Sequence, residues 1–360
     1  MRISRRVGVP LALLGATLLL TSCAVNEQNL PPGSDLAGIV VGGGASSQQA
    51  AQEAWVAGFQ SLNPDATVEY DPAGSGAGRD MFIAGGASFA GSDRAFTADE
   101  LATKEFAACA PGSGIIELPT YIAPIVIVFK VDGVSDLKLD PDTMARIFGG
   151  DITRWNDDAI AEQNSGVQLP DLEITPVHRS DESGTTENFT DYLAAAAPDA
   201  WPHEPSGTWP FEGGEAAQGT SGVVDTVRNG AGTIAYVDAS RAGDLGVVSV
   251  KVGNEYVPYS AEAASAIVDA SPIAEDRAPG DLAIEIDRTT EEAGVYPIVL
   301  ISYLIGCAEY ADPSQAELAA AYFDYVISDD AQALAAKYSG SAPISATLQE
   351  QAAQAVALIK

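Results

Sequence analysis

Three segments of the chain repeat one local pattern: a short apolar strand, a loop of glycine with serine or threonine, and then residues spaced as in a helix. They lie at residues 39–59, 67–83 and 173–193. The first N–H groups of a helix lack internal partners and carry the positive end of its dipole, so such a helix start binds an anion readily. One copy would be weak evidence, because connections between strands and helices commonly contain glycine. Three copies with hydroxyl side chains predict a cradle for an anion.

Each loop of the repeat has its own composition. The loop at 42–47 precedes two aromatic residues four positions apart, and Ser46 or Ser47 is expected to be the N-cap of a helix. The loop at 74–78 has glycine at every second position, which lets the backbone approach a ligand closely. The loop at 178–186 combines serine, glycine and threonine with a single arginine.

The start of the chain differs from the rest. Three arginines precede an apolar run at 7–20, as in an export signal, and the run is shorter than the roughly 20 residues of a membrane span. The sequence Leu-Thr-Ser-Cys at 20–23 resembles the bacterial lipoprotein signal, which predicts removal of residues 1–22 and a membrane anchor on Cys23. Ordinary cleavage nearby, with an incidental cysteine, is the alternative. Residues 23–33 are polar and lack periodicity, so we expect a tether.

Two further cysteines remain. Without Cys23, Cys109 and Cys307 form an even pair in an exported protein, which favours a disulfide. Two buried free thiols are the alternative, because the sequence does not show that the two residues meet.

Length and charge limit the classes of protein and partner. With 360 residues, two domains are expected. The formal net charge is −32, and removal of residues 1–22, which hold three arginines and no acids, gives −32 − 3 = −35. Such a surface excludes nucleic acid as a partner. It does not exclude a small anion, because charges beyond about 8 to 10 Å are largely screened at physiological salt.

Asp93 ends an apolar strand that follows the second loop. Together with the three loops, this strand makes the chain strongly resemble the phosphate-binding proteins of bacterial high-affinity phosphate ABC transporters, which are type II periplasmic-type solute-binding proteins. The matching stretches are 42–46, 70–78, 89–93, 155–160, 179–185, 232–237 and 296–298. They span most of the chain after the signal, and several ordered matches are more specific than any single one.

The resemblance implies a set of phosphate-binding groups. The hydroxyl donors would be Ser46, Ser75, Ser183 and Thr185, and the backbone donors would be the N–H groups of Ser47, Ser183, Gly184 and Thr185. Arg179 would contact phosphate and Asp181 would orient it. Ser46 and Ser47 stand where threonine and phenylalanine are familiar in the family. The first keeps a hydroxyl and the second uses its backbone, so the cradle should persist.

Asp93 matches the family's carboxylate that accepts the phosphate proton. Phosphate carries at least one proton at neutral pH and sulfate carries none, so a desolvated aspartate accepts a hydrogen bond from phosphate and repels sulfate. A hydrogen bond to a charged group is worth about 1.5 to 3 kcal/mol. Since 1.4 kcal/mol is a factor of ten, discrimination of at least one to two orders of magnitude is expected.

The expected fold class is α/β: a two-lobe periplasmic-binding-protein-like fold of type II, with two open α/β sheets joined by two crossover strands. Apolar segments at 124–129 and 296–301 are the expected crossovers. They would divide the chain into a first lobe of residues 34–127 plus 299–360 and a second of residues 128–298. Ligands of such sheets lie beyond the carboxyl ends of the strands, so phosphate would bridge the cleft and favour closure.

Other segments are less specific. Residues 201–222 are rich in proline and glycine and are expected to form either a loop or an additional feature of the lobe that belongs to a permease-facing surface. The alanine-rich segments 314–334 and 346–359 predict helices on the first lobe.

The expected function is that of an extracytoplasmic lipoprotein, anchored to the bacterial cell membrane, that captures inorganic phosphate for the permease subunits of an ABC-type importer. We expect a monomer without cofactor or metal, and not an enzyme. One alternative is a binder of another tetrahedral oxyanion, such as sulfate or molybdate. A second is a secreted phosphatase-like enzyme, although no Gly-x-Ser-x-Gly elbow is present and His178 is expected to be a strand-end side chain beside the ligand.

Overall fold

The computed structural model describes residues 36–360, so the expected signal, the tether and Cys23 lie outside the described residues. The strands are β1 (Gly38–Gly44), β2 (Ala66–Asp71), β3 (Phe89–Ser92), β4 (Ile115–Lys130), β5 (Asp136–Leu139), β6 (Thr175–Arg179), β7 (Glu215–Ala217), β8 (Thr233–Asp238), β9 (Gly246–Val252), β10 (Glu255–Val257) and β11 (Val299–Cys307).

The helices alternate with these strands. They are α1 (Gln49–Leu62), α2 (Ser75–Ile83), α3 (Ala98–Thr103), α4 (Pro141–Phe148), α5 (Asp158–Gln163), α6 (Gly184–Ala196), α7 (Gly219–Asn229), α8 (Ala261–Ala270), α9 (Pro313–Val326), α10 (Asp329–Ser339) and α11 (Ala346–Val356), with a 3-10 turn η1 (Ala239–Arg241). This is the α/β composition that the sequence predicts.

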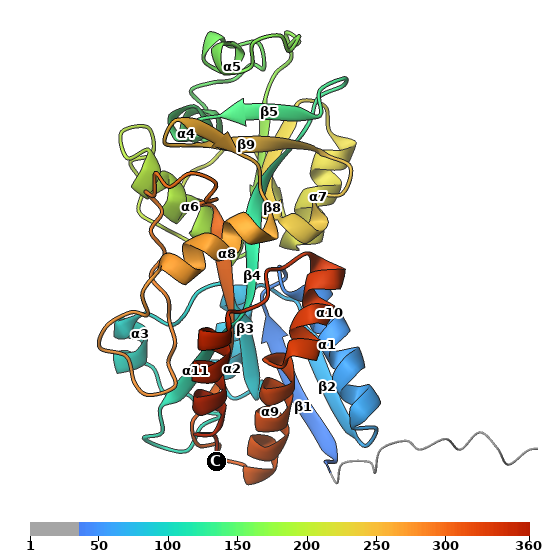
Figure 1. Ribbon diagram of the computed structural model, residues 1–360, viewed down its shortest axis with the longest axis vertical. Coiled ribbons are helices and arrows are strands. Elements are labelled where there is room, and N and C mark those ends of the chain that lie inside the picture. The colour runs from blue at the N-terminus through green and yellow to red at the C-terminus, as the bar shows by residue number, and fades with distance from the viewer. Residues whose placement is uncertain (1–35) are drawn as a thin grey trace, which may run out of the picture. The chain divides into compact units, whose positions relative to one another are not determined.

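One long strand, β4, joins two parts of the sheet (Figure 1). The strand order is β2-β1-β3-β11-β4-β8-β6-β7, and β9 pairs with β4, β5 and β10. β4 pairs with β11 up to Pro124 and with β8 from Ile125 onward. Only Lys130 of β4 is exposed. A strand buried on both faces reads as a near-continuous apolar run, which is why residues 121–129 of this strand are all apolar apart from the tyrosine hydroxyl.

The strand directions bring the carboxyl ends of both parts together. β1, β2 and β3 run parallel to one another, and β11 is antiparallel to both β3 and β4. β8 is antiparallel to β4, while β6 and β7 run parallel to β8. The ends of β1 and β3 therefore face the ends of β6 and β8 where β4 passes from one part to the other.

The second expected crossover differs from the prediction. β4 continues through the junction as one strand, but β11 begins only at Val299 and pairs within the first part. The preceding residues are held by isolated contacts: the N–H of Ile125 donates to the carbonyl of Ile298 at 2.7 Å, and the Tyr296 hydroxyl donates to the carbonyl of Ile125 at 2.9 Å. One continuous strand and one irregular segment thus connect the two parts.

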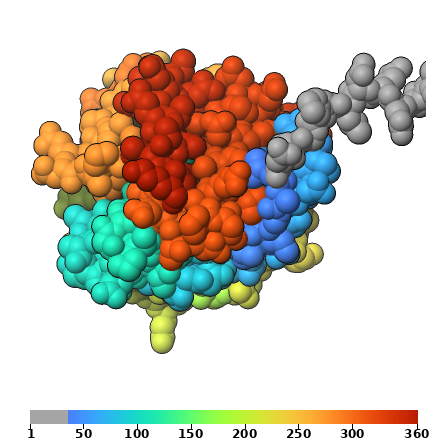
Figure 2. All heavy atoms as spheres, turned by 90° about the horizontal axis from the view of Figure 1, so that it is seen from below, coloured from blue at the N-terminus to red at the C-terminus, as the bar shows by residue number. Residues whose placement is uncertain are grey.

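The helices of both chain ends pack on the first part of the sheet. In α1, Trp55 and Phe59 are buried, which confirms the predicted apolar face. α1 contacts α10, and α9 contacts β1; Figure 2 shows these C-terminal segments in red and orange-red beside the blue segment that begins at β1. The segment 314–334 forms two helices rather than one, because the Ser328 hydroxyl caps α10 by accepting from the N–H of Ala331.

A disulfide joins the loop before β4 to the end of β11. Cys109 and Cys307 are bonded, with Cα atoms 5.3 Å apart across 198 residues of sequence. In a chain-entropy account, closing a loop of this length stabilises the folded state by about 5 kcal/mol.

Candidate functional site

The glycine loops from the two parts of the sheet touch one another. A Cβ atom added to Gly184 would lie 2.4 Å from the Cβ of Asp93 and 2.7 Å from the Oγ of Ser75. One added to Gly74, which has a φ of +110°, would lie 2.7 Å from an Oδ of Asp181. These glycines permit a backbone approach that no other residue would, so the three predicted loops meet at one place.

Asp93 follows β3 and receives hydrogen bonds from both parts. Its Oδ1 accepts from the hydroxyls of Ser47 at 2.6 Å and Ser302 at 2.5 Å, and its Oδ2 accepts from the hydroxyl of Thr185 at 3.2 Å. Its own N–H donates to the Oγ of Ser75 at 3.2 Å. The carboxylate is thus fixed by donors from the start of α1, from β11 and from the first turn of α6.

The environment of Asp93 acts on its pKa in opposite directions. Burial raises the pKa of this carboxyl above its ordinary value. Hydrogen bonds from Ser302 and Ser47 oppose that rise, as do the positive charge of Arg179 and the Thr185 hydroxyl. The carboxyl is therefore a desolvated acceptor with a net raised pKa, held by hydroxyl donors instead of a direct ion pair.

Arg179 ends β6 and is held by Asp181. Its Nε donates to one carboxylate oxygen of Asp181 at 2.8 Å, and an Nη donates to the other. The N–H of Gly219 also donates to Asp181, at 3.0 Å. Burial raises the pKa of Asp181, but Arg179 and this N–H outweigh it and hold the pKa below its ordinary value. Asp181 orients the guanidinium and stays ionised.

The two serines of the first loop play different parts from those expected. Gln48, not Ser46 or Ser47, is the N-cap of α1, and it makes no side-chain cap. The Ser46 hydroxyl instead contacts the hydroxyl of Thr220 at 3.0 Å and accepts from the N–H of Thr220 at 3.3 Å. The side chain of Ser47 is bound to Asp93, whereas the sequence predicted a role for its backbone alone. The N-cap prediction was wrong because both hydroxyls find other partners, Thr220 at the start of α7 for Ser46 and Asp93 after β3 for Ser47.

Three serines share one arrangement. The Oγ of Ser46 accepts from the N–H of Thr220, that of Ser75 from Asp93, and that of Ser183, the N-cap of α6, from Thr186 at 3.3 Å. Each hydroxyl oxygen is therefore already engaged by a backbone donor. The protons of Ser75 and Ser183 remain available to a ligand, and that of Ser46 is available when the Thr220 hydroxyl donates to it.

The structure brings every predicted cradle residue into this cluster: Ser46, Ser47, Ser75, Asp93, Arg179, Asp181, Ser183, Gly184 and Thr185. The seven serine, threonine, arginine and Asp93 side chains are no more than 7% exposed. Because water is largely excluded, hydrogen bonds and charges act here at a low effective dielectric.

Three residues of the cluster were not predicted from the sequence. Ser302 comes from β11, where neither glycine nor a helix start marks it. Gly219 and Thr220 open α7 after the short strand β7, within the segment 201–222 that was expected to be only a loop. Their sequence, Gly-Thr-Ser-Gly at 219–222, repeats the strand, small-residue loop and helix pattern, so a signal was present.

Two ion pairs tie the loops of the two parts beside the cluster. Arg79 of α2 contacts Glu182 at 2.6 Å, and Arg94 contacts Glu187 of α6 at 2.9 Å. Both join a residue of the first part to the loop or helix that follows β6. They therefore hold the hydrogen-bond donors of the first part beside those of the second.

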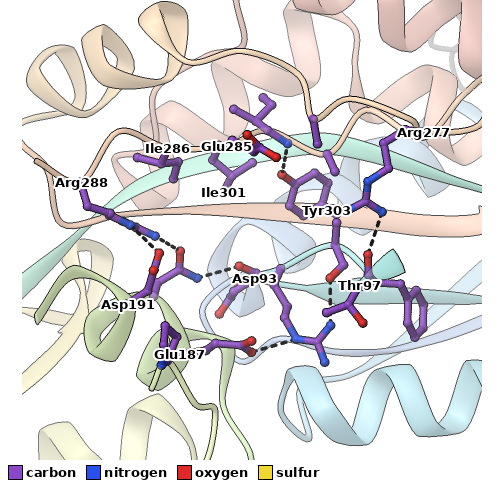
Figure 3. Close-up of a pocket in the computed structure, with 18 residues that line it drawn as sticks. Asp93, Thr97, Glu187, Asp191, Arg277, Glu285, Ile286, Arg288, Ile301 and Tyr303 are labelled. Atoms are coloured by element: carbon purple, nitrogen blue, oxygen red, sulfur yellow. Dashed lines mark hydrogen bonds and ion pairs between the residues drawn. The ribbon is translucent and has the colours of Figure 1, made fainter. Parts of the chain in front are cut away.

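A pocket of about 410 Å³ also borders Asp93 and contains three arginines (Figure 3). Each arginine is paired: Arg94 with Glu100 and Glu187, Arg277 with Asp281, and Arg288 with Asp191. The pocket lining also includes the carboxylates of Glu187, Asp191 and Glu285 and contains no serine, so it offers an anion fewer neutral donors than the cradle does. Arg288 also donates to the Oδ1 of Asn188 at 2.5 Å, and Asn188 donates to the carbonyl of Asp93 at 2.7 Å, which fixes the Asp93 backbone.

The cluster combines many neutral donors with one guanidinium and two carboxylates, of which Asp181 is engaged by Arg179 and Gly219. The N–H groups at the starts of α2, α6 and α7 and the three serine hydroxyls can replace the hydration shell of an anion, and Arg179 can neutralise it. The Oδ2 of Asp93 can accept a proton-bearing oxygen. Such a set suits a tetrahedral oxyanion that retains a proton. Residues 36–360 contain no group of His, Cys, Asp and Glu that could hold a metal, and no helix among them is long and apolar enough to cross a membrane.

Comparisons with known proteins agree with this chemistry. A sequence model described as a PBP superfamily domain matches residues 30–330. The phosphate-binding protein PstS2 of Mycobacterium bovis (strain BCG / Pasteur 1173P2) is 32% identical over 368 residues, which cover 98% of this chain and 98% of that protein. The phosphate-binding protein PstS 3 of Mycobacterium leprae (strain TN) is 34% identical over 325 residues, covering 85% of this chain and 86% of that protein.

Among solved structures, a high affinity periplasmic phosphate-binding protein bound with phosphate at pH 8.5 superposes with a TM-score of 0.71 at 25% identity. The match covers 87% of this chain and 92% of that chain.

Proposed function

Because the chain belongs to the PBP superfamily and, within it, to the family of bacterial phosphate-binding proteins named PstS, we propose that it binds inorganic phosphate outside the cytoplasm. It then delivers phosphate to the permease subunits of an ABC-type phosphate importer. The observation that carries the proposal is the arrangement of Ser46, Ser75 and Ser183, whose hydroxyl oxygens each accept a backbone N–H. Ser75 and Ser183 keep their own protons for a ligand, and Ser46 does so when the Thr220 hydroxyl donates to it.

The roles of the residues follow from their contacts. Ser46, Ser75 and Ser183 would donate hydroxyl protons to phosphate, and the N–H groups of Ser47 and Gly184 would add to them. Ser183 and Thr185 would also contribute their backbone N–H groups. The Thr185 hydroxyl already donates to Asp93, so its donation to phosphate requires its proton to turn away from that carboxylate.

Arg179, held by Asp181, would supply the positive charge, and Asp93 would accept the phosphate proton through Oδ2. Sulfate carries no proton at neutral pH and would meet the carboxylate as a like charge without a hydrogen bond. Asp93 is therefore the proposed selector between the two oxyanions.

The two parts of the sheet correspond to two lobes in this proposal, residues 34–127 plus 299–360 and residues 128–298. The change of β4 partner at Pro124 and Ile125 supports a boundary there. Ser46, Ser75 and Asp93 belong to the first lobe and Arg179 to Thr185 to the second, so phosphate would bind between them. A ligand shifts such a hinge by its differential affinity for the closed form.

Attachment to the membrane is the second element of the proposal. The cysteine after an export signal, Cys23, would carry the lipid, and residues 23–33 would tether a monomeric binding unit. Expression of the full chain and of Cys23→Ser in a bacterium, followed by membrane fractionation, tests this. The variant is expected in the soluble fraction, and its retention in membranes would contradict the anchor; sedimentation velocity of the released protein should give a monomer.

A phosphatase is the rival function, and the contacts of the two histidines disfavour it. His178 lies face to face with Trp209 at 5.0 Å between ring centroids, and both its ring nitrogens lie within hydrogen-bond distance of backbone carbonyls. Neither histidine, both of which lie in the described residues, forms a hydrogen bond with a serine. The cluster therefore lacks the serine–histidine pair that activates the nucleophile of many hydrolases.

Thermal unfolding in phosphate, sulfate and molybdate tests the proposal against both alternatives. A ligand at 100 times its dissociation constant stabilises a protein by about 2.7 kcal/mol, so phosphate should raise the unfolding midpoint clearly while sulfate at the same concentration should not. An equal response to sulfate or molybdate would favour a different oxyanion. Turnover of a phosphomonoester that is lost in Ser183→Ala would favour the enzyme.

A further inference from the structure

A buried chain of hydrogen bonds leads from the core behind α1 to the carboxylate of Asp93. The Tyr322 hydroxyl donates to the Oε1 of Gln52 at 2.6 Å, and the Nε2 of Gln52 donates to the Oε1 of Gln48 at 2.8 Å. The Nε2 of Gln48 donates to the Oγ of Ser302 at 2.6 Å. None of these four side chains is more than 1% exposed, so water does not compete for the bonds.

The direction of this chain is fixed at one point by the backbone. The Nε2 of Gln48 also donates to the carbonyl of Tyr303 at 3.1 Å. A carbonyl oxygen can only accept, so the Gln48 atom facing it must be the nitrogen. The other amide atom of Gln48 is then an acceptor, which in turn sets the orientation of Gln52.

Ser302 therefore has one way to bond to Asp93. Gln48 approaches its oxygen as a donor, and the hydroxyl proton finds the Oδ1 of Asp93 at 2.5 Å. The register of β11 against β4 shifts between Ser302 and Tyr303. Irregularities of this kind re-aim side chains beside functional sites.

Resting on the proposed function, we propose that Gln48 and Ser302 determine phosphate specificity as positioning residues: with Ser47, they saturate Oδ1 of Asp93 with donors and leave Oδ2 as the only oxygen that can accept a ligand proton. A carboxylate oxygen has two lone-pair sites, and two hydroxyls fill them on Oδ1. A proton placed on Oδ1 would point at two hydroxyl groups that already donate to this oxygen. The arrangement therefore keeps Asp93 an acceptor of hydrogen bonds.

The other charged or titratable groups around Asp93 do not replace this effect. Arg179 from β6 favours the ionised carboxylate. Tyr70 from β2 and Asp238 at the end of β8 interact with it electrostatically. None of the three donates a hydrogen bond to Asp93, so the hydroxyls fix its orientation: two donate to Oδ1, and only Thr185 donates to Oδ2, which keeps one lone-pair site for a ligand.

The test compares Ser302→Ala with wild type and Ser302→Thr by calorimetric titration of phosphate and sulfate between pH 5.5 and pH 8.5. Loss of one donor to a charged group should weaken phosphate binding by about tenfold or more. The loss of phosphate affinity in Ser302→Ala, relative to wild type, should grow as pH falls. Without this donor Asp93 takes up a proton at a higher pH and then no longer accepts the proton of phosphate. Ligand protonation is the same for all variants and cancels in the ratio to wild type.

Three controls separate this role from a structural one. Ser302→Thr keeps a hydroxyl and should retain the wild-type pH profile, and Gln48→Met, which cannot donate to Ser302, should move the profile in the same direction as Ser302→Ala. Ser339→Ala removes a buried hydroxyl that donates within α10 and should change nothing. If Ser302→Ala does not fold, Gln48→Met decides.

The outcomes distinguish the two proposals. A wild-type protein that binds sulfate as well as phosphate would overturn the proposed function. A wild-type protein that prefers phosphate, with Ser302→Ala and Gln48→Met showing the same phosphate-to-sulfate ratio at every pH, would overturn the positioning role alone.

Discussion

Asp93 is the residue on which oxyanion selectivity depends. Three hydroxyls donate to it, and Arg179 is the nearest positive charge that favours its ionised form. A carboxylate that is buried without a direct ion pair is costly unless hydrogen bonds satisfy it, which the hydroxyls do. The same lack of a direct cation leaves it strong enough as an acceptor to distinguish a protonated oxyanion from an unprotonated one.

Replacing Asp93 with asparagine should weaken this discrimination. The amide can donate to sulfate and loses the charge that repels it, so the ratio of phosphate to sulfate affinity should fall by about tenfold to a hundredfold. Calorimetric titration of both anions measures the ratio. Asp157→Asn changes an N-cap of α5 and serves as the matched control. An unchanged ratio in Asp93→Asn would remove the selector role.

Asp238, at the end of β8, makes stability depend on pH. Burial raises its pKa from 3.8 to about 7, against hydrogen bonds from Ser240 and Tyr121. Between these two values the folded protein holds a proton that the unfolded chain has lost. Because the folded state binds more protons, stability falls as pH rises through this window and levels off above it.

Asp238→Asn should therefore flatten the pH dependence. Asparagine cannot ionise and can still accept from Tyr121, so the variant should gain stability relative to wild type between pH 5 and pH 8. Unfolding midpoints without ligand at several pH values provide the comparison. Parallel profiles for the two proteins would show that Asp238 keeps an ordinary pKa.

At this scale the sequence was most informative where a side chain follows a glycine loop. Ser75, Arg179 and Ser183 lie where the pattern predicts, because each occupies a fixed position relative to a strand end and a helix start. Ser302 and Thr220 depend on which strand lies beside β3 and on which helix reaches the first loop. Those are long-range pairings that no local pattern encodes.

Among the elements, α6 begins at a close backbone contact between the two parts of the sheet. Its first residue, Gly184, lies against Asp93 and Ser75, and its N-cap is Ser183. A methyl group at 184 would overlap backbone and Cβ atoms of Asp93 rather than the end of a flexible side chain.

Gly184→Ala should therefore impair binding more than folding. The methyl group would hold the loops apart in the liganded form, so the rise in unfolding midpoint with phosphate should be largely lost, while the midpoint without phosphate should change little. Gly222→Ala in α7 adds a methyl at an ordinary distance of 3.6 Å from Ala217 and is the matched control. Full stabilisation of Gly184→Ala by phosphate would contradict the close approach in the bound state.

Helices and strands with strong periodicity were predicted well, but the residues at which they begin and end were predicted less well. The apolar run of β4 was recognised from six of its residues, but the strand continues to Ile115 because β11 pairs with it along that whole length. The break between α9 and α10 was missed because both flanking segments are rich in alanine, and only the cap at Ser328 separates them.

For the whole molecule, the central expectation is closure of two lobes around phosphate. If the described arrangement corresponds to the closed form, the ion pairs Arg79–Glu182 and Arg94–Glu187 should separate when phosphate leaves. Small-angle scattering should then show a larger radius of gyration without phosphate than at saturation. Gly184→Ala should remain expanded at the same phosphate concentration, and equal radii for wild type in both conditions would rule out hinge closure.

The most direct test of the site is a crystal structure of the protein grown with phosphate. The account predicts one phosphate ion within hydrogen-bond distance of the hydroxyls of Ser46, Ser75 and Ser183, the guanidinium of Arg179 and the Oδ2 of Asp93. A phosphate ion found instead in the arginine-lined pocket beside Arg277 and Arg288, with the serine cluster filled by water, would contradict it.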